Sequence, residues 1–419
     1  MDPSTTASRR LLSIHNHTSP VPDTADGLVL VLPKGSKVTA VGSNETFTQL
    51  QLDKRPIIEY HILSKLSLAL ELAAVGTRFE GTTEHIPKAN LFEISSPREQ
   101  TGIFKDIPIA DAWVAIYALF TLYRTNEHIP VRLTTVPNAE DLSKYLTSTG
   151  LGRRYQGSKK LQIAKSVIFL SRAAFWQGAG TTGYHDCGWL LSPTSAFPLI
   201  PSFTRSEMVI ASHPLRPPKP RAGKALYRRY CTAVGQTLEF VAFDIHGNAE
   251  QDGGLSPHMA AFHKWHNDER VNNAWGEKGN LETHREYIEG LLADPGVVPI
   301  MMSWDGELMG YVEIVWVKEN HAAQHYPADA AVGNWERGIH VLVGEDKFLG
   351  GGRSEIWLRS LAHYIFLADP RTDRVLGEPK ESNIAIVKAA QSAGFHIHAV
   401  SLVGQLQNRS RLNILLIDH

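Results

Sequence analysis

Three consecutive glycines, Gly350-Gly351-Gly352, constrain the fold of this 419-residue chain more than any other feature. They follow a strand-like segment, GIHVLVGE (338–345), and precede a segment with helical apolar spacing, SEIWLRSLAHYIFLADP (354–370). Glycines have no Cβ, so successive backbone N–H groups can turn towards one point without steric clashes. The N-terminus of the following helix adds a partial positive charge at the same place. The glycines alone leave two interpretations open, an anion-binding loop and a flexible turn. The spacing is neither G-x-G-x-x-G nor a Walker A loop.

The rest of the C-terminal half predicts a mixed sheet with one βαβ crossover at its centre. Asp305-Gly306 is typical of a hairpin turn, here within the segment 297–319. The other predicted elements are a strand at 238–245, helices at 258–271 and 281–295, a strand at 373–379, a helix at 382–395, and closing strands at 396–403 and 410–419.

A proline-rich segment, HPLRPPKPRAG (213–223), reads as an extended linker, because its four prolines exclude helix and central strand. It predicts an N-terminal α/β domain at 1–212 and a second domain at 224–419. The N-terminal elements expected are strands at 27–33, 131–136 and 166–176, and helices at 57–74, 110–126 and 139–150. This half has no glycine loop, so we expect a scaffold, a degenerate copy of the second domain, or a part in dimer formation.

Composition excludes several classes of protein. The formal net charge of −1 argues against a nucleic-acid-binding protein, and no apolar run reaches the roughly eighteen residues of a membrane helix. Two cysteines, Cys187 and Cys231, indicate a reducing compartment. Arg10-Leu11 followed by His17 resembles an N-terminal peroxisomal address, and a polar disordered terminus is the alternative. We therefore expect a peroxisomal or cytoplasmic location.

From about residue 225 to its end, the chain resembles the GNAT acyltransferase fold. In that fold a strand leads into a loop whose amides hold the coenzyme A pyrophosphate, and a later helix carries Asn-x10-Gly-Phe. Asn383 and Gly394-Phe395 have that spacing. The resemblance implies acyl-CoA as co-substrate, bound by Val341, Leu342, Val343, Gly350, Gly351, Gly352, Arg353, Ser354 and Asn383.

A narrower resemblance rests on five segments in the same order: FHKWHNDERVNNAWGEKG, YVEIVWVKEN, RGIHVLVGE, LAHYIFLADPRTDRVLGEPKESN and the final GF pair. They are similar to the GNAT family that acylates hydroxylysine or hydroxyornithine in hydroxamate siderophore synthesis. That family includes the aerobactin acetyltransferase, the mycobactin lysine acyltransferase and the fungal hydroxyornithine acyltransferases. The two-part layout most resembles the fungal members, and among them the anhydromevalonyl transferase.

The expected catalytic residues are His340 and Glu378. Many GNAT enzymes have a tyrosine acid seven positions after the helix asparagine, but Ala390 stands there in this chain. His340 lies on the strand before the glycine loop and titrates in a suitable range. The resemblance pairs such a histidine with an acid in the Gly-(Asp/Glu)-Pro segment, here Glu378. A structural histidine inside the sheet is the alternative.

The acceptor-binding residues are predicted less directly. Strand alternation puts Glu313 and Trp316 on opposite faces of 313–318. The resemblance favours the face of Trp316 and Lys318, and ordinary packing is the alternative for Trp316. His266 and Asn267 belong to a polar cluster that forms either an amino-acid-binding loop or a capped helix end. The cluster lacks zinc-type spacing, so no metal is expected.

Three functions follow. The first is transfer of an acyl group, with anhydromevalonyl-CoA as donor, to N5-hydroxyornithine in siderophore biosynthesis. The second keeps the fold and uses acetyl-CoA or N6-hydroxylysine. The third is an inert scaffold or binding protein of the same fold, and the glycine loop with His340 and Glu378 argues against it.

Overall fold

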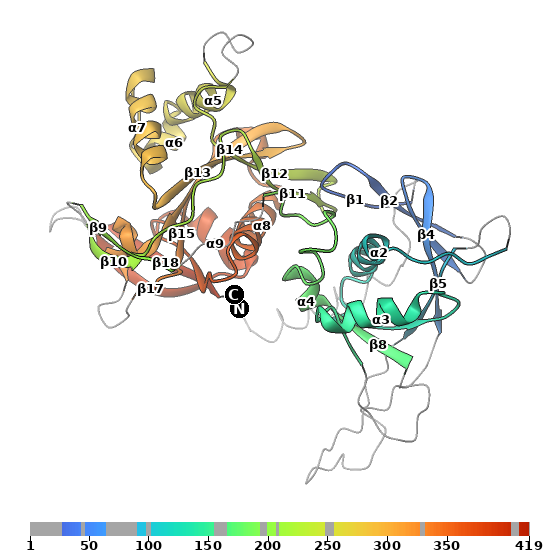
Figure 1. Ribbon diagram of the computed structural model, residues 1–419. Helices are drawn as coiled ribbons and strands as arrows, with labels where there is room; N and C mark the ends of the chain where they lie inside the picture. Colours follow the sequence, from blue (N-terminus) through green and yellow to red (C-terminus); the bar gives the residue numbers. More distant parts are fainter. Residues whose placement is uncertain are drawn as a thin grey trace, which may run out of the picture. The chain divides into compact units, whose positions relative to one another are not determined.

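The computed structural model describes residues 27–42, 47–63, 90–97, 102–154, 166–192, 199–206, 209–247, 255–326, 332–403 and 410–418. The chain forms two compact units, Met1–Gly188 and Trp189–His419, each built on its own mixed β-sheet (Figure 1). The predicted α/β class is confirmed. The segment with the predicted peroxisomal address, from Arg10 to His17, lies outside the described residues.

The N-terminal unit contains an eight-stranded sheet with the order β1-β2-β3-β4-β5-β6-β8-β7. Its strands are β1 (Leu28–Val31), β2 (Lys37–Gly42), β3 (Thr48–Leu52), β4 (Arg55–Leu63), β5 (Leu91–Ser95), β6 (His128–Leu133), β7 (Gly152–Arg154) and β8 (Val167–Ser171). Its helices are α2 (Ile109–Leu122), α3 (Ala139–Ser148) and α4 (Arg172–Trp176).

Two sequence predictions in this unit are wrong. The segment predicted as a helix from residue 57 begins as strand β4, because pairing with β3 and β5 on both sides overrides its helical apolar spacing. Residues 64–74 of that prediction lie outside the described residues. The strand predicted at 166–176 ends at Ser171, whose hydroxyl accepts from the Ala174 amide at 3.3 Å and starts helix α4.

The second unit contains an eight-stranded sheet with the order β11-β12-β13-β14-β15-β16-β18-β17, and a separate hairpin. The strands of the sheet are β11 (Ala225–Cys231), β12 (Gln236–Ala242), β13 (Val297–Trp304), β14 (Glu307–Trp316), β15 (Arg337–Val343), β16 (Arg374–Gly377), β17 (His396–Val403) and β18 (Ser410–Asp418). The hairpin is β9 (Pro201–Arg205) with β10 (Ile210–Pro214). The helices are α5 (Pro257–His266), α6 (Glu269–Trp275), α7 (Leu281–Ala293), α8 (Arg353–Ala368) and α9 (Ile384–Ala393), and the 3-10 helices are η2 (Val317–Glu319), η3 (His321–His325) and η4 (Asp346–Phe348).

The two units share one topology. In each sheet the first five strands pair antiparallel, the fifth and sixth pair parallel, and the last two return antiparallel. The parallel pair is joined by a helix in both cases, α2 between β5 and β6 and α8 between β15 and β16. The N-terminal unit therefore repeats the strand arrangement of the second unit.

Helices α5, α6 and α7 cover one face of the second sheet (Figure 1). Each begins at a residue whose side chain accepts a backbone N–H: Ser256, Asp268 and Asn280. Their apolar residues, among them Phe262 and Trp265, form a buried cluster with Tyr311 and Leu342 of the sheet. This packing fixes which side chains of β14 and β15 face the three helices.

The proline-rich segment 213–223 lies within the second unit, downstream of the division at Gly188. Arg216 of this segment is buried, pairs with Glu319 at 2.6 Å, and lies 4.1 Å from the ring centroid of Trp316. Residues 215–220 form neither helix nor strand, as expected of an extended segment, and this ion pair with the stacking on Trp316 holds the segment against the sheet. No helix in the described ranges is long and apolar enough to cross a membrane.

Candidate active site

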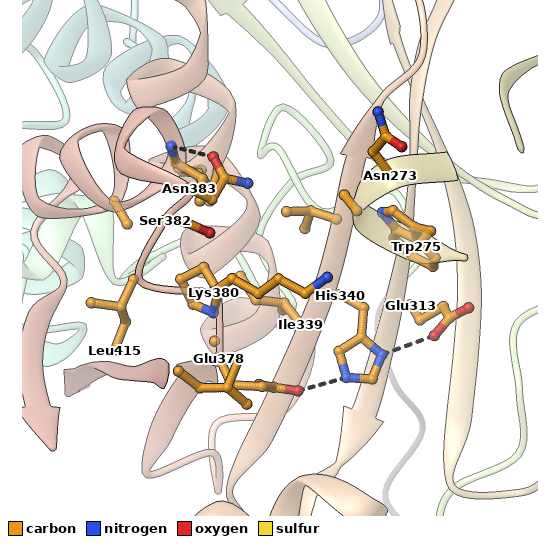
Figure 2. A pocket seen from close by; sticks show the side chains of 18 of the residues that line it. Asn273, Trp275, Glu313, Ile339, His340, Glu378, Lys380, Ser382, Asn383 and Leu415 are labelled. Atoms are coloured by element: carbon orange, nitrogen blue, oxygen red, sulfur yellow. Dashed lines mark hydrogen bonds and ion pairs between the residues drawn. The ribbon is translucent and has the colours of Figure 1, made fainter. Parts of the chain in front are cut away.

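The parallel strands β15 and β16 separate soon after they begin to pair. Their register contains Arg337 opposite Val375 and Gly338 opposite Leu376, and no further pair follows. A cavity of about 680 Å³ opens where they diverge (Figure 2). Its wall comes from α6, α7, β14, β15, α8, the segment after β16, α9 and β18. This cavity therefore lies at the βαβ crossover that the glycine loop predicted.

A carboxylate–imidazole–carboxylate line crosses this cavity. His340 Nδ1 lies 2.9 Å from Glu313 Oε2, and His340 Nε2 lies 2.8 Å from Glu378 Oε1 (Figure 2). Glu313 comes from β14, His340 from β15 and Glu378 from the residue after β16. The predicted pair of His340 and Glu378 is thus brought together, and the structure adds a second carboxylate on the opposite side of the ring.

Two tyrosines hold Glu313. The Tyr287 hydroxyl of α7 donates to Glu313 Oε1 at 2.7 Å, and the Tyr311 hydroxyl donates to the same oxygen at 3.2 Å. Glu313 is buried, and every oxygen of its carboxylate has a partner. This residue was predicted to bind substrate, but in the structure its contacts orient His340.

The two carboxylates set the charge of the imidazole. Burial is the largest influence on His340 and lowers its pKa, but the hydrogen bonds and charges of Glu313 and Glu378 outweigh it and raise the pKa to about 10. Burial likewise raises the pKa of Glu313, but His340, Tyr287 and Tyr311 bring it below the ordinary value. At neutral pH His340 is therefore an imidazolium that donates from both ring nitrogens.

One carboxylate oxygen of the Glu313–His340–Glu378 line can still accept a hydrogen bond from a ligand. Glu378 Oε2 is buried and has no hydrogen-bond partner, whereas Oε1 accepts from His340. Because a buried carboxylate oxygen without a donor is costly, this atom is a natural acceptor for a substrate proton. On the far side of the ring, His321 of η3 stacks on His340 with ring centroids 5.3 Å apart.

The glycine loop has the open backbone that its sequence predicts. Gly350, Gly351 and Gly352 have φ values of 73°, 59° and 74°, in the left-handed region that favours glycine. Gly352 precedes α8, and no side chain caps the first turn of that helix. Arg353 turns towards β12, where its guanidinium donates to Gln236 Oε1 at 3.0 Å. The Arg353 amide donates to the Gly350 carbonyl at 3.2 Å, and no side chain competes with an anion for the N-terminus of α8.

Helix α9 forms another part of the cavity wall. Asn383 caps this helix by accepting from the Ile386 amide at 3.4 Å, and it lines the cavity together with Val341 of β15. Ala390, about two helical turns after Asn383, also lines the cavity. The position that carries a tyrosine in many GNAT enzymes therefore faces the cavity here without a hydroxyl.

Four predicted acceptor residues do not line the cavity. Trp316 is buried between Arg216 and Arg337, whose guanidinium carbons lie 4.1 and 3.9 Å from its ring centroid. Lys318 donates to Asn334 Oδ1 at 2.8 Å. The face of β14 that meets the cavity is that of Glu313, so the choice of the Trp316 face is not supported by the geometry.

His266 and Asn267 have structural contacts. His266 is fully buried, and burial is the main cause that lowers its pKa to about 4, so the ring is neutral. The Asn267 amide donates to the carbonyls of His263 and Gly279 at 3.0 and 2.9 Å. These bonds match the alternative of a capped helix end at α5.

Sequence reasoning missed several residues of the cavity wall. They come from α6 and the segment after it, from α7, from η3 and from the segment after Glu378, and comprise Arg270, Asn273, Ala274, Trp275, Glu277, Tyr287, His321, Lys380 and Ser382. No spacing marks them in the sequence, because they meet only through the packing of α5–α7 on the sheet. The NNAWGEKG segment within the family-like motif is the one signal that pointed to this region.

The side chains of His321, His340 and Glu378 could also face a metal ion, since their ligand atoms lie within 4.8 Å of one another. A metal would have to replace the proton on His340 Nε2, because both ring nitrogens are engaged with carboxylates. The two carboxylates stabilise the protonated ring, and this disfavours replacement of the proton by a metal ion.

The N-terminal unit has a counterpart of this line at the equivalent strands. His61 of β4 lies 2.9 Å from Glu93 of β5, and Arg132 of β6 pairs with the same carboxylate. In this group the acid Glu93 has the central position that His340 has in the second unit. Glu93 and Arg132 are also register partners in the parallel pair of β5 and β6. The strands β5 and β6 remain joined past this point, since Thr134 N donates to Ile94 O at 2.9 Å.

Comparison with known proteins agrees with this architecture. A model described as an acetyltransferase (GNAT) domain matches residues 255–400. An acyltransferase of Omphalotus olearius, ato1, is 39% identical over 277 residues, which are 64% of this chain and 66% of that protein. The hydroxyornithine transacylase SID3 of Ajellomyces capsulatus is 34% identical over 307 residues, 69% of this chain and 67% of SID3.

A third relative is the N(5)-hydroxyornithine:cis-anhydromevalonyl coenzyme A-N(5)-transacylase SIDF of Beauveria bassiana. It is 34% identical over 309 residues, 66% of this chain and 65% of that protein. The fold and the matched domain define a GNAT protein. The chain belongs to the GNAT acyltransferase family, in the group that includes proteins named as hydroxyornithine transacylases. The chain spans slightly less than two thirds of ato1.

Proposed function

We propose that the protein transfers an acyl group from acyl-CoA to the side-chain hydroxylamine nitrogen of N5-hydroxyornithine, forming a hydroxamate for siderophore biosynthesis. The observation that carries the proposal is the Glu313–His340–Glu378 line inside the cavity at the parted strands β15 and β16. The thioester enters from the glycine loop, and the acceptor nitrogen meets it beside Glu378.

The acyl-CoA would be held by the backbone of this chain. The amides from Gly350 to the first turn of α8 take the pyrophosphate, and Val341 and Asn383 line the path of the pantetheine arm. A thioester placed at the opening between β15 and β16 then lies next to the proton-handling line. This arrangement uses the separation of the two strands as the donor site.

The proton steps follow from the charges. The hydroxylamine nitrogen attacks the thioester carbonyl, a C–N bond forms, and the nitrogen must lose one proton. His340 is already protonated on both nitrogens, so Glu378 Oε2 receives that proton, and the imidazolium stabilises the ionised Glu378 before the reaction. His340 is therefore the residue that positions and charges the acceptor carboxylate.

The leaving thiolate needs a proton when the C–S bond breaks. Ala390 offers none, so the proton just collected by Glu378 is the one returned to sulfur. Glu378 thus takes up and releases one proton in each turnover, and Glu378 and His340 return to their starting protonation states. Glu313 keeps its charge throughout, because Tyr287 and Tyr311 both donate to it.

The chemistry favours a hydroxylamine over an alkylamine. A hydroxylamine nitrogen is much less basic, so it is neutral at physiological pH and keeps its lone pair for attack. The ammonium of ornithine would have to lose a proton before it could react, and the carboxylates of the site would hold it in its charged form. We expect ornithine to be a poor acceptor for this reason.

Anhydromevalonyl-CoA is the proposed donor, as the name of SIDF suggests for that relative. Acetyl-CoA is the alternative donor, and N6-hydroxylysine is the alternative acceptor. A peroxisomal location, as the segment from Arg10 to His17 suggests, is part of the same proposal.

The test is product detection by mass spectrometry with N5-hydroxyornithine and each donor offered separately. A hydroxamate from anhydromevalonyl-CoA, absent with Glu378→Gln, is the expected result. A hydroxamate from acetyl-CoA alone would select the alternative donor. Failure of both donors, in a protein that also fails to bind coenzyme A by calorimetry, would leave an inert scaffold.

A further inference from the structure

Charged side chains line the cavity, and not all of them have an ion pair or hydrogen bond with another protein group. Among the described residues, those of Arg270, Glu313, His340 and Glu378 are engaged, because each has an ion pair or hydrogen bond to another protein group. Arg270, for example, donates to the carbonyls of Val343 and Gly344, both at 3.0 Å. Two further charged side chains line the same cavity, and they have opposite signs.

The first is Glu277, in the segment between α6 and α7. Its backbone is fixed, because its carbonyl accepts from His284 Nε2 at 2.7 Å. Its carboxylate has no hydrogen bond or ion pair within the described chain. It lies near Tyr287, whose pKa is raised first by burial and then by the charges of Glu313 and Glu277. Glu277 is bonded through its carbonyl to α7, the helix whose Tyr287 donates to Glu313, so it meets the cavity on the Glu313 side.

The second is Lys380, two residues beyond Glu378. Its backbone is also fixed, by a bridge to Leu412 and by the Asn383 amide, which donates to the Lys380 carbonyl at 2.9 Å. Its side chain lies across the cavity, with the ammonium directed towards the strand that carries His340 (Figure 2). No carboxylate of the described residues pairs with this ammonium.

We propose that Glu277 binds the α-ammonium and Lys380 binds the α-carboxylate of a free amino-acid acceptor. The inference rests on the proposed function and adds a subsite for the head group. An acid and a base on fixed backbone, facing one cavity without pairing, complement the two charges of a zwitterion. The side-chain hydroxylamine then extends to Glu378.

The two charges cannot both serve the acyl donor. Coenzyme A offers phosphates but no group as cationic as an ammonium, so an acid in the cavity gains nothing from it and Glu277 would repel its phosphates. Lys380 alone could bind a phosphate, which makes the donor the rival ligand for that residue. If Lys380 binds a phosphate of the donor, its substitution should lower kcat/KM equally with every acceptor. If Lys380 belongs to a head-group subsite, the loss of kcat/KM should depend on the acceptor.

The experiment pairs each variant with an acceptor that lacks the matching group. N-hydroxyputrescine lacks the α-carboxylate, and N2-acetyl-N5-hydroxyornithine lacks the α-ammonium. With N5-hydroxyornithine we expect kcat/KM to fall about tenfold to a hundredfold in Lys380→Met and in Glu277→Gln. With the truncated acceptor that matches each variant, the same substitution should change kcat/KM less than about threefold. Lys380→Arg, which keeps the charge, should retain most of the activity.

Lys388→Met is the matched control, since Lys388 is an exposed lysine of α9 that does not line the cavity. Equal losses with all three acceptors, or a higher KM for acyl-CoA in Lys380→Met, would overturn the head-group subsite. Absence of turnover with any acceptor in the wild-type protein would instead overturn the proposed function. The two failures are therefore distinguishable.

Discussion

His340 lies on β15 and Glu378 directly follows β16, just beyond the point where these parallel strands stop pairing, and their side chains are 2.8 Å apart. A side-chain hydrogen bond thus joins the two strands where their backbone pairing has ended, and both residues line the cavity. This relationship makes the pair the centre of the predictions below.

Glu378→Gln should lower kcat by about 10²- to 10⁴-fold, because it removes the carboxylate oxygen that takes the substrate proton. The variant keeps the shape of the side chain and its contact with His340. Single-turnover hydroxamate formation measures the effect, and calorimetry should find unchanged coenzyme A binding. Activity within threefold of wild type would rule out Glu378 as the proton acceptor.

Glu313→Gln should lower the pKa of His340 from about 10, because one of the two carboxylates that favour the imidazolium is lost. NMR titration of the imidazole nitrogens measures this directly. Tyr287→Phe should shift the same pKa less, since it removes only one hydrogen bond to Glu313. A His340 titration that does not move in Glu313→Gln would refute the role of Glu313.

The raised pKa of His340 also predicts a pH dependence of stability. A folded-state pKa above the unfolded value of about 6.5 stabilises the fold fully below pH 6.5, and the contribution disappears as the pH rises through about 10. The difference in urea midpoint between wild type and His340→Gln should therefore shrink from pH 6.5 to pH 10. A difference that is constant over this range would contradict the assignment.

Gly351→Ala should raise the KM for acyl-CoA. Its φ of 59° disfavours a side chain, and a Cβ would lie 2.9 Å from a guanidinium nitrogen of Arg353. Gly150→Ala is the control, since Gly150 has a φ of 77° in the N-terminal unit with no atom within 4 Å of its Cβ. Both changes should cost about 1 kcal/mol of stability, but only the first should affect coenzyme A binding.

Trp316→Leu should destabilise the protein by roughly 2 to 4 kcal/mol and leave the acceptor KM unchanged. The ring is buried between Arg216 and Arg337, outside the cavity, so its loss removes packing and two cation–π contacts. Urea unfolding and steady-state kinetics measure the two effects. A raised acceptor KM in a stably folded variant would restore the substrate role predicted from the sequence.

The sequence by itself determined the elements of the central crossover and marked its candidate catalytic residues. The apolar spacing around Gly350–Gly352, the Asn383 to Gly394 interval and the motif residues His340 and Glu378 are local patterns, and each is found where it was predicted. The elements could be predicted because strands, helices and their turns have short-range periodicities, whereas the interest of His340, Glu378 and Asn383 came from the resemblance to the GNAT family. The strand β4 was missed because its pairing with β3 and β5 on both sides overrides its helical apolar spacing.

Only the tertiary structure decided which side chains meet. Strand alternation left Glu313 and Trp316 as equal candidates, and the packing of α5–α7 on one face of the sheet selected Glu313. The same packing brings Glu277 to the cavity, and the turn after β16 brings Lys380, although no spacing links them. The charge of His340 likewise depends on two carboxylates 27 and 38 residues away. Such contacts arise from the packing of whole elements, which one-dimensional patterns do not encode.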